Sequence, residues 1–163
     1  MRILVVSDTH GDSDALYRLW QCEKSRTDLL LHLGDGEQDV DDLRAVDPLV
    51  PIRYVRGNCD YRSAAADTGV VALDGLRILF THGHMFNVNY TLERISAEAR
   101  KQGACVALFG HTHRQLCLYD NNITLLNPGS LSKPRDGKCG YACIEIIKMQ
   151  PVCTLYRVDS PSQ

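Results

Sequence analysis

Short apolar runs recur along the chain and are separated by glycine, aspartate, asparagine and histidine, a pattern that predicts β-strands. The dipeptide Asp74-Gly75 joins two of these runs and favours a tight hairpin turn. No run is long enough for a secretory leader or a membrane-spanning helix. The predicted strands cover residues 2–7, 29–33, 52–55, 70–73, 76–81, 105–109, 116–119, 123–127, 141–147 and 153–158.

Two stretches between the strands have the period of amphipathic helices, and Gly103 is a candidate C-cap for the second stretch. The first part of the chain therefore reads as βαβαβ, while later hairpins predict antiparallel strands joined to a parallel core. We expect an α/β fold in which two mixed sheets pack together with helices outside. The apolar helix faces are Leu16, Leu19 and Trp20 in one stretch and Leu92, Ile95 and Ala99 in the other.

Composition narrows this expectation to a single globular domain spanning residues 1–163. A chain of 163 residues has the size of one ordinary domain, and 44% hydrophobic with 23% charged residues is typical of soluble proteins. The net charge of -2 gives no general attraction to nucleic acid, so an extended nucleic-acid surface is not expected. Without an apparent leader or membrane span, we expect a cytoplasmic protein.

The seven cysteines are an odd number without a C-x-x-C pair, which indicates reduced thiols. Cys139 and Cys143 are four residues apart. Two independent thiols are favoured here over a metal clip.

Residues able to bind metal follow nearly every predicted strand in the first two-thirds of the chain. Any one of these elements could be an ordinary turn, because Gly, Asn and Asp are common turn formers. Five of them in order favour a metal site, since loops at the carboxyl ends of neighbouring strands converge. His32 lies inside an apolar run and is expected to be a buried structural residue. The five elements are Asp8-Thr9-His10, Gly34-Asp35, Gly57-Asn58-Cys59-Asp60, Thr81-His82-Gly83-His84 and Gly110-His111-Thr112-His113.

This order resembles the calcineurin-like metallophosphoesterase superfamily, whose pattern is D-x-H, G-D, G-N, a histidine after a strand, then G-H-x-H. The segments 57–60, 81–84 and 127–130 look more narrowly like the small, single-domain phosphodiesterases of the YfcE type. The resemblance covers the chain to about Arg135. It implies a four-layer αββα sandwich with a dinuclear metal site between the sheet edges.

The resemblance implies a ligand set for two divalent ions. Asp35 is expected to bridge them, because each carboxylate oxygen can bind one ion. Nitrogen and oxygen ligands without a thiolate favour a transition metal over Ca or Mg. Manganese is the expected ion, with Fe, Zn, Co and Ni as alternatives. The other ligands are Asp8, His10 and His113 for the first ion and Asn58, His82 and His111 for the second.

The expected reaction is hydrolysis of a small phosphodiester, in which a hydroxide shared by both ions attacks phosphorus in line. Cys59 stands where many superfamily members carry a histidine that protonates the leaving oxygen, and His84 is the nearest substitute. We therefore expect a preference for esters with good leaving groups. Candidate catalytic residues are Asp35, Asn58, Cys59, Asp60 and His84; candidate substrate-binding residues are Gly129, Ser130 and Arg135, beside Lys133. An ordinary tight turn with solvated charges is an equal alternative for the 129–135 segment.

Two other functions stay open from the sequence. One is a non-catalytic scaffold, because the same fold serves as a subunit of the retromer complex, and fold alone does not give function. The other is a phosphomonoesterase or protein phosphatase, although the protein phosphatase motifs G-D-x-x-D-R-G and G-N-H-E fit less well. The sequence leaves open the natural substrate and whether the chain forms a homo-oligomer.

Overall fold

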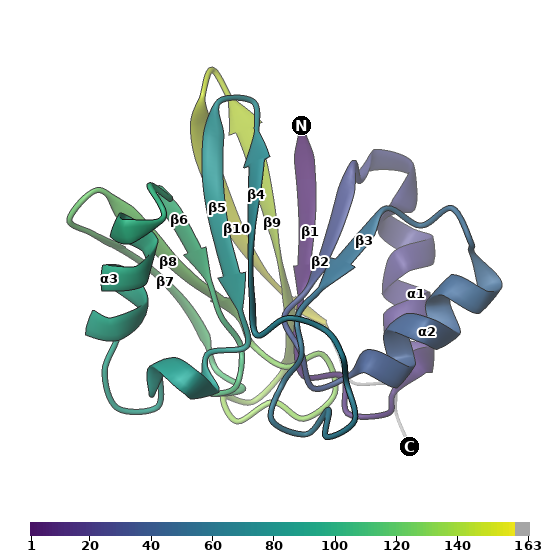
Figure 1. The fold of residues 1–163 in the computed structure, drawn as a ribbon. Helices are drawn as coiled ribbons and strands as arrows, with labels where there is room; N and C mark the ends of the chain where they lie inside the picture. Colours follow the sequence, from purple (N-terminus) through teal and green to yellow (C-terminus); the bar gives the residue numbers. More distant parts are fainter. Residues whose placement is uncertain (159–163) are drawn as a thin grey trace.

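Two five-stranded mixed sheets pack face to face in the computed structural model, which describes residues 1–158 (Figure 1). In the first sheet the spatial order is β10 (Gln150–Val158), β9 (Cys139–Ile147), β1 (Arg2–Val6), β2 (Leu29–His32) and β3 (Ile52–Tyr54). In the second it is β4 (Thr68–Leu73), β5 (Leu76–Thr81), β6 (Val106–Leu108), β8 (Ile123–Pro128) and β7 (Gln115–Asp120).

Helices cover the outer faces of both sheets. Helices α1 (Ser13–Glu23) and α2 (Glu37–Val46) pack on the first sheet, and α3 (Glu93–Lys101) packs on the second. Two short 3-10 helices, η1 (Lys24–Arg26) and η2 (His84–Phe86), complete the elements of the described chain. Figure 1 shows α3 on the opposite side of the sheets from α1 and α2. The predicted αββα sandwich is confirmed.

Alternating apolar residues within one strand supply two different core layers. In β1, Ile3 and Val5 point into the layer between the sheets, whereas Leu4 and Val6 pack beneath α1 and α2. All four side chains are fully buried. A strand covered on both faces must be apolar at every position, so the continuous run in the sequence follows from this packing.

All ten predicted strands are present, with boundaries that differ by up to three residues. The hairpin between β4 and β5 is confirmed, with φ of +46° at Asp74 and +80° at Gly75. Helix α2 is the second helix of the expected βαβαβ unit, although the sequence pattern does not predict which residues form it. In residues 1–158, no helix has the length and apolar character needed to cross a lipid bilayer.

The parallel strands of each sheet end on the same side of the molecule. Strands β1, β2 and β3 run parallel, as do β5, β6 and β8. Figure 1 shows their following loops together at the lower edge of the two sheets. This arrangement gathers residues that are more than 100 positions apart in sequence.

A buried carboxylate, Glu23 at the end of α1, ties this helix to strands β1 and β9 of the first sheet. Its oxygens lie 2.7 Å from Arg2 Nη1 and 2.7 Å from Arg26 Nη2, and Tyr141 donates a hydrogen bond of 3.1 Å. Burial acts to raise the pKa of Glu23, but the hydrogen bonds from Arg26 and Arg2 outweigh it and lower the pKa. The ionised carboxylate therefore stabilises the fold.

We expect Glu23→Gln to lower the free energy of unfolding by about 3 kcal/mol, because Arg2 loses its buried counter-charge. The carboxylate's contribution is present above the pKa of unfolded glutamate, about 4.3, and is lost as pH falls towards the lower folded pKa. Urea unfolding at several pH values measures both effects. The matched control is Glu145→Gln, whose half-exposed side chain lies 3.7 Å from Arg2 Nε. Equal losses in the two variants would contradict the prediction.

Candidate metal centre

The seven predicted metal ligands all lie on loops that directly follow strands at the shared lower edge of the sheets. The first sheet contributes Asp8 and His10 after β1, Asp35 after β2 and Asn58 after β3; the second contributes His82 after β5 and His111 and His113 after β6. The site thus spans the junction of both sheets, and each sheet supplies part of it.

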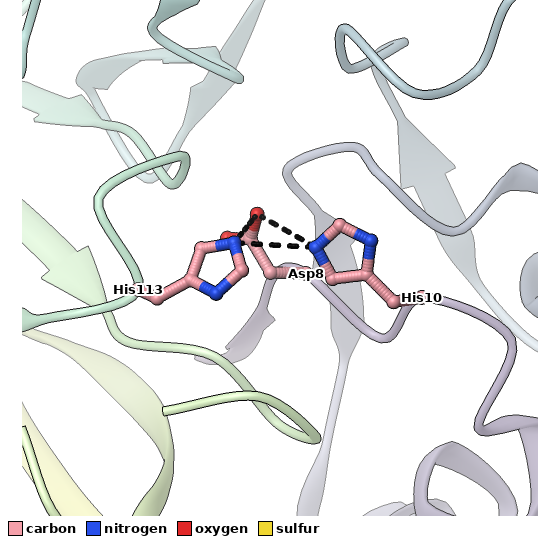
Figure 2. Close-up of side chains that lie close together, drawn as sticks. All are labelled: Asp8, His10 and His113. Atoms are coloured by element: carbon pink, nitrogen blue, oxygen red, sulfur yellow. Dashed lines mark hydrogen bonds and ion pairs between the residues drawn. The ribbon is translucent and has the colours of Figure 1, made fainter. Parts of the chain in front are cut away.

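Asp8, His10 and His113 form a compact group (Figure 2). The Nε2 atoms of the two histidines are 3.2 Å apart, and Asp8 Oδ1 lies 3.1 Å from His113 Nε2 and 3.8 Å from His10 Nε2. Figure 2 shows both imidazole edges turned towards the Asp8 carboxylate. Three donor atoms converging from two sheets are suited to hold one cation.

Asp8 Oδ1 is buried and has no hydrogen-bond partner among the described residues. The other oxygen is fully engaged, because the Ser7 hydroxyl and the His111 backbone N–H donate to Oδ2 at 2.6 and 3.1 Å. Buried polar atoms are nearly always satisfied, and an ion is one explanation for an exception. A cation bound to Oδ1 fits this arrangement.

A second group is centred on His82, which is fully buried. Its Nδ1 lies 2.8 Å from the Leu33 carbonyl, which can only accept, so Nδ1 carries a proton and Nε2 is the ring atom placed to bind an ion. Nε2 lies 3.1 Å from Asn58 Oδ1 and 3.5 Å from Asp35 Oδ2. The three atoms are close enough to share one cation.

His113 is held in the same way, because its Nδ1 lies 2.7 Å from the Lys133 carbonyl. A backbone carbonyl behind the ring fixes the tautomer and aims Nε2 at the metal position. His111 lies at the margin of the second group, with its ring centroid 5.1 Å from that of His82.

Asp35 stands between the two groups. Its Oδ2 lies 3.8 Å from His10 Nε2 and 3.5 Å from His82 Nε2, whereas its Oδ1 accepts a 2.7 Å hydrogen bond from the Cys59 backbone N–H. The sequence predicts that each carboxylate oxygen of Asp35 binds one ion. Here a single oxygen faces both groups, because the other oxygen is used to fix the 57–60 loop.

Two glycines are required by the close approach of these loops. A Cβ atom on Gly57 would overlap Asp35 Oδ1, and one on Gly110 would overlap the Ser7 hydroxyl. The glycines of the G-N and G-H-x-H elements therefore serve steric needs. Five predicted ligands also have positive φ, between 47° and 66°, a conformation that such residues rarely adopt: Asp8, His10, Asp35, His111 and His113.

Asp60 accepts hydrogen bonds only from backbone groups of the loops. Its Oδ2 accepts from Asp35 and Gly57, and its Oδ1 from Gly36 and Glu37, at 2.7 to 3.1 Å. Burial acts to raise the pKa of Asp60, but these backbone bonds outweigh it and lower the pKa. These bonds position Asp35 and the start of α2, and the catalytic role of Asp60 stays a prediction from the sequence.

The buried Asp39 carboxylate shapes the Asp8–His10 loop. The Thr9 hydroxyl donates to Asp39 Oδ2, which also accepts from the Gly11 N–H at 3.0 Å. His32 continues the network, with Nε2 3.1 Å from Thr9 Oγ1 and Nδ1 accepting from the Gly34 N–H. Burial lowers the pKa of His32 to about 4, so it is neutral at physiological pH. His32 is fully buried, as predicted.

The 127–130 segment also supports the site from within the protein. Ser130 is fully buried and donates from its hydroxyl to the Asp8 carbonyl at 2.7 Å, while the Gly129 N–H is taken by Asn127 Oδ1. Asn127 in turn donates to the Gly110 carbonyl and the Thr112 hydroxyl. The substrate-binding role of Gly129 and Ser130 stays a prediction from the sequence. Asn127 and Asp39 were missed because no local pattern marks a side chain that supports a distant loop.

The remaining candidates lie around the site. A cleft of about 240 Å³ includes His10, Asp35, Cys59, Asp60 and Lys133. The Cys59 thiol falls in a compact group with His10 and Asp35, and burial with the nearby Asp35 carboxylate raises its pKa to about 11. The His84 ring lies 5.4 Å from that of His82. Arg135 donates from its backbone N–H to the His113 carbonyl at 2.9 Å, and its side chain is exposed.

Known proteins share both the sequence pattern and the fold. Residues 1–149 match the model of the calcineurin-like phosphoesterase superfamily domain. The chain is 33% identical over 136 residues to "Probable metallophosphoesterase YsnB" of Bacillus subtilis, covering 83% of this chain and 78% of that protein. It is 28% identical over 159 residues to the phosphodiesterase YfcE of Escherichia coli, covering 84% and 83% of the two chains.

Solved structures agree with these matches. A predicted phosphoesterase from Streptococcus pneumoniae superposes with a TM-score of 0.84 at 31% identity, covering 96% of this chain and 88% of that one. Vps29 of Chaetomium thermophilum superposes with a TM-score of 0.77 at 21% identity, covering 97% and 95%, a likeness in fold alone. The family match extends over nine-tenths of the chain and includes every loop of the cluster. The chain belongs to the calcineurin-like phosphoesterase superfamily.

Proposed function

We propose that this protein is a phosphodiesterase that works with two divalent transition-metal ions, manganese foremost. The observation that carries the proposal is the buried, unpartnered Asp8 Oδ1 beside the Nε2 atoms of His113 and His10. The second donor group, around His82, shares Asp35 with the first. Two adjoining groups of candidate metal ligands that share Asp35 support a dinuclear centre.

The donor set accounts for the chemistry that we assign to the site. Bound divalent ions supply Lewis acidity and lower the pKa of water, which suits hydrolysis of phosphate esters. Asp8 and Asp35 are the two carboxylates among the seven proposed ligands, so they leave a surplus of positive charge when two divalent ions are held. An anionic ester is attracted to such a site. Lys133, exposed beside the cleft, adds to that attraction.

The choice of a diester over a monoester rests on the resemblance of this chain, along 84% of its length, to the phosphodiesterase YfcE. Cys59 bears on the leaving group instead: it replaces the histidine found in many superfamily members, so the site lacks one proton donor for a poor leaving group. A cytoplasmic location and the single-domain organisation stay predictions from the sequence.

A scaffold function is the second candidate, favoured by the similarity in fold to Vps29 proteins. Loss of ligands would support it, yet none of the seven proposed ligand positions here carries a residue unable to bind metal. Hydrolysis assays distinguish the two: a scaffold would bind metal without turning over an aryl diester.

The purified protein should hold about two transition-metal ions per chain, because two donor groups share Asp35. Metal analysis by mass spectrometry measures this content. Chelation should abolish hydrolysis of bis(p-nitrophenyl) phosphate, and manganese should restore it best. Undiminished hydrolysis by metal-free protein would overturn the proposal.

Asp35→Asn and Asn58→Ala should each lower kcat/KM by orders of magnitude, since the first removes the charge of the residue between the two groups and the second removes a proposed ligand of the second group. His32→Ala should chiefly lower the melting temperature, because the His32 ring is buried in the network with Thr9 and is not a proposed ligand. The control for Asp35→Asn is Asp41→Asn, an exposed position on α2. If His32→Ala abolished turnover with an unchanged melting temperature, the division between site and core would be wrong.

Cys59→His should increase activity on alkyl esters more than on aryl esters, because a poor leaving alkoxide needs a proton in the transition state. A tenfold gain in relative rate requires only about 1.4 kcal/mol. The measurement is kcat/KM for one aryl and one alkyl ester with wild type, Cys59→His and Cys59→Ala, with metal content checked each time. Equal changes for both esters would contradict this role of position 59 and would indicate that His84 or a water molecule protonates the leaving group.

A further inference from the structure

A cavity of about 750 Å³ lies beside the metal centre, on the side of the second sheet. One wall is the loop after η2, and the other is the loop from β6 to β7. Thr112, which lines the cavity, stands between the proposed ligands His111 and His113 in the chain. Thr112 therefore brings one edge of the cavity next to two proposed ligands.

The cavity is apolar in its depth and aromatic at its mouth. Tyr90 lines it with a ring that is 86% exposed, and so can stack on a planar group. The buried or partly buried apolar lining consists of Val88, Leu92, Phe109 and Leu116. Such walls favour an aromatic occupant over a short alkyl chain.

Two unpaired positive charges face this space. Arg114 and Arg135 line the cavity, and its lining contains no aspartate or glutamate. Neither guanidinium forms a hydrogen bond or ion pair with another residue of the described chain, whereas those of Arg2, Arg56 and Arg157 are paired with carboxylates. In a chain of net charge -2, this local surplus favours an anion. Arginine is well suited to bind carboxylate or phosphate groups.

We propose that the cavity binds an aromatic ester group that carries a further acidic substituent, so that the substrate is a diester with an anionic aryl group. This inference rests on the proposed function and adds a substrate class to it. The ring packs against the apolar lining and Tyr90. Its acidic group pairs with Arg114 and Arg135, while the diester phosphate occupies the metal centre.

Three p-nitrophenyl diesters test the proposal, with methyl, 4-carbamoylphenyl or 4-carboxyphenyl as the second ester group. All three release p-nitrophenol, and the two larger probes have nearly the same shape but differ in charge. With manganese-loaded wild type, kcat/KM for the carboxyphenyl ester should exceed that for the carbamoylphenyl ester about tenfold, or ~1.4 kcal/mol. Each value is divided by the uncatalysed rate of the same probe.

The variants separate charge from stacking. Arg114→Gln and Arg135→Gln should each reduce the carboxyphenyl preference several-fold, and the double variant should bring the ratio close to one. Tyr90→Ala should reduce the preference for the carbamoylphenyl ester over the methyl ester about fivefold. Arg53→Gln on β3 removes the same charge from the first sheet and should leave both ratios unchanged.

The outcomes keep the two proposals apart. A wild-type ratio near one, or a preference that survives in the double variant, overturns the assignment of this cavity while leaving the phosphodiesterase in place. If metal-loaded wild type hydrolyses none of the three probes, the phosphodiesterase proposal itself fails. The substituted arginines are exposed, and thermal unfolding of each variant verifies its fold.

Discussion

The buried Asp8 carboxylate is the constraint on which the arrangement of the site depends. It lies just after β1, the central strand of the first sheet, and is fully buried. Burial acts to raise the pKa of Asp8, but the nearby imidazoles of His113 and His82 and the Ser7 hydroxyl outweigh it and lower the pKa. The fold therefore keeps a negative charge in its interior. That charge needs partners from other loops, and it draws histidines from the second sheet towards the first.

The two sheets are joined at this edge by polar contacts as well as by their shared apolar layer. His82, from the second sheet, bonds to the Leu33 carbonyl of the first, and Ser130, after β8, donates to the Asp8 carbonyl. Each contact positions a proposed ligand through backbone atoms. A displacement of one sheet against the other would therefore disturb both the core and the donor geometry. The site and the sandwich are stabilised by the same contacts.

Two features of this chain are suited to a hydrolase. The seven proposed ligand positions carry residues able to bind metal. The neighbouring cavity also has a chemical character suited to a small ligand, because two unpaired arginines stand over apolar walls. A surface adapted mainly to another protein would not need an unsatisfied carboxylate oxygen buried beneath it. The buried oxygen of Asp8 is the strongest mark of a cation site.

The sequence by itself determined the strands, the αββα architecture and the residues that gather at the sheet edge. These features depend on short segments, because an apolar run followed by Asp, Asn or His can be recognised as a strand and its ligand-bearing loop within a few residues. The parallel order of the strands then brings such loops together. Helix α2 could be expected only from the connection between parallel strands, since its few buried residues do not form a clear apolar period.

Only the tertiary structure decided how the supporting residues act. The Asp60 carboxylate fixes the backbone of residues 35–37 and 57. The Ser130 hydroxyl holds a loop 122 residues earlier in the chain. The pairing of one Asp35 oxygen with Cys59, and the cavity beside Arg114, likewise arise between separate loops. Sequence pattern records the chemistry of a residue and its local conformation, whereas the direction of a buried side chain depends on which distant backbone groups the folded chain leaves unsatisfied.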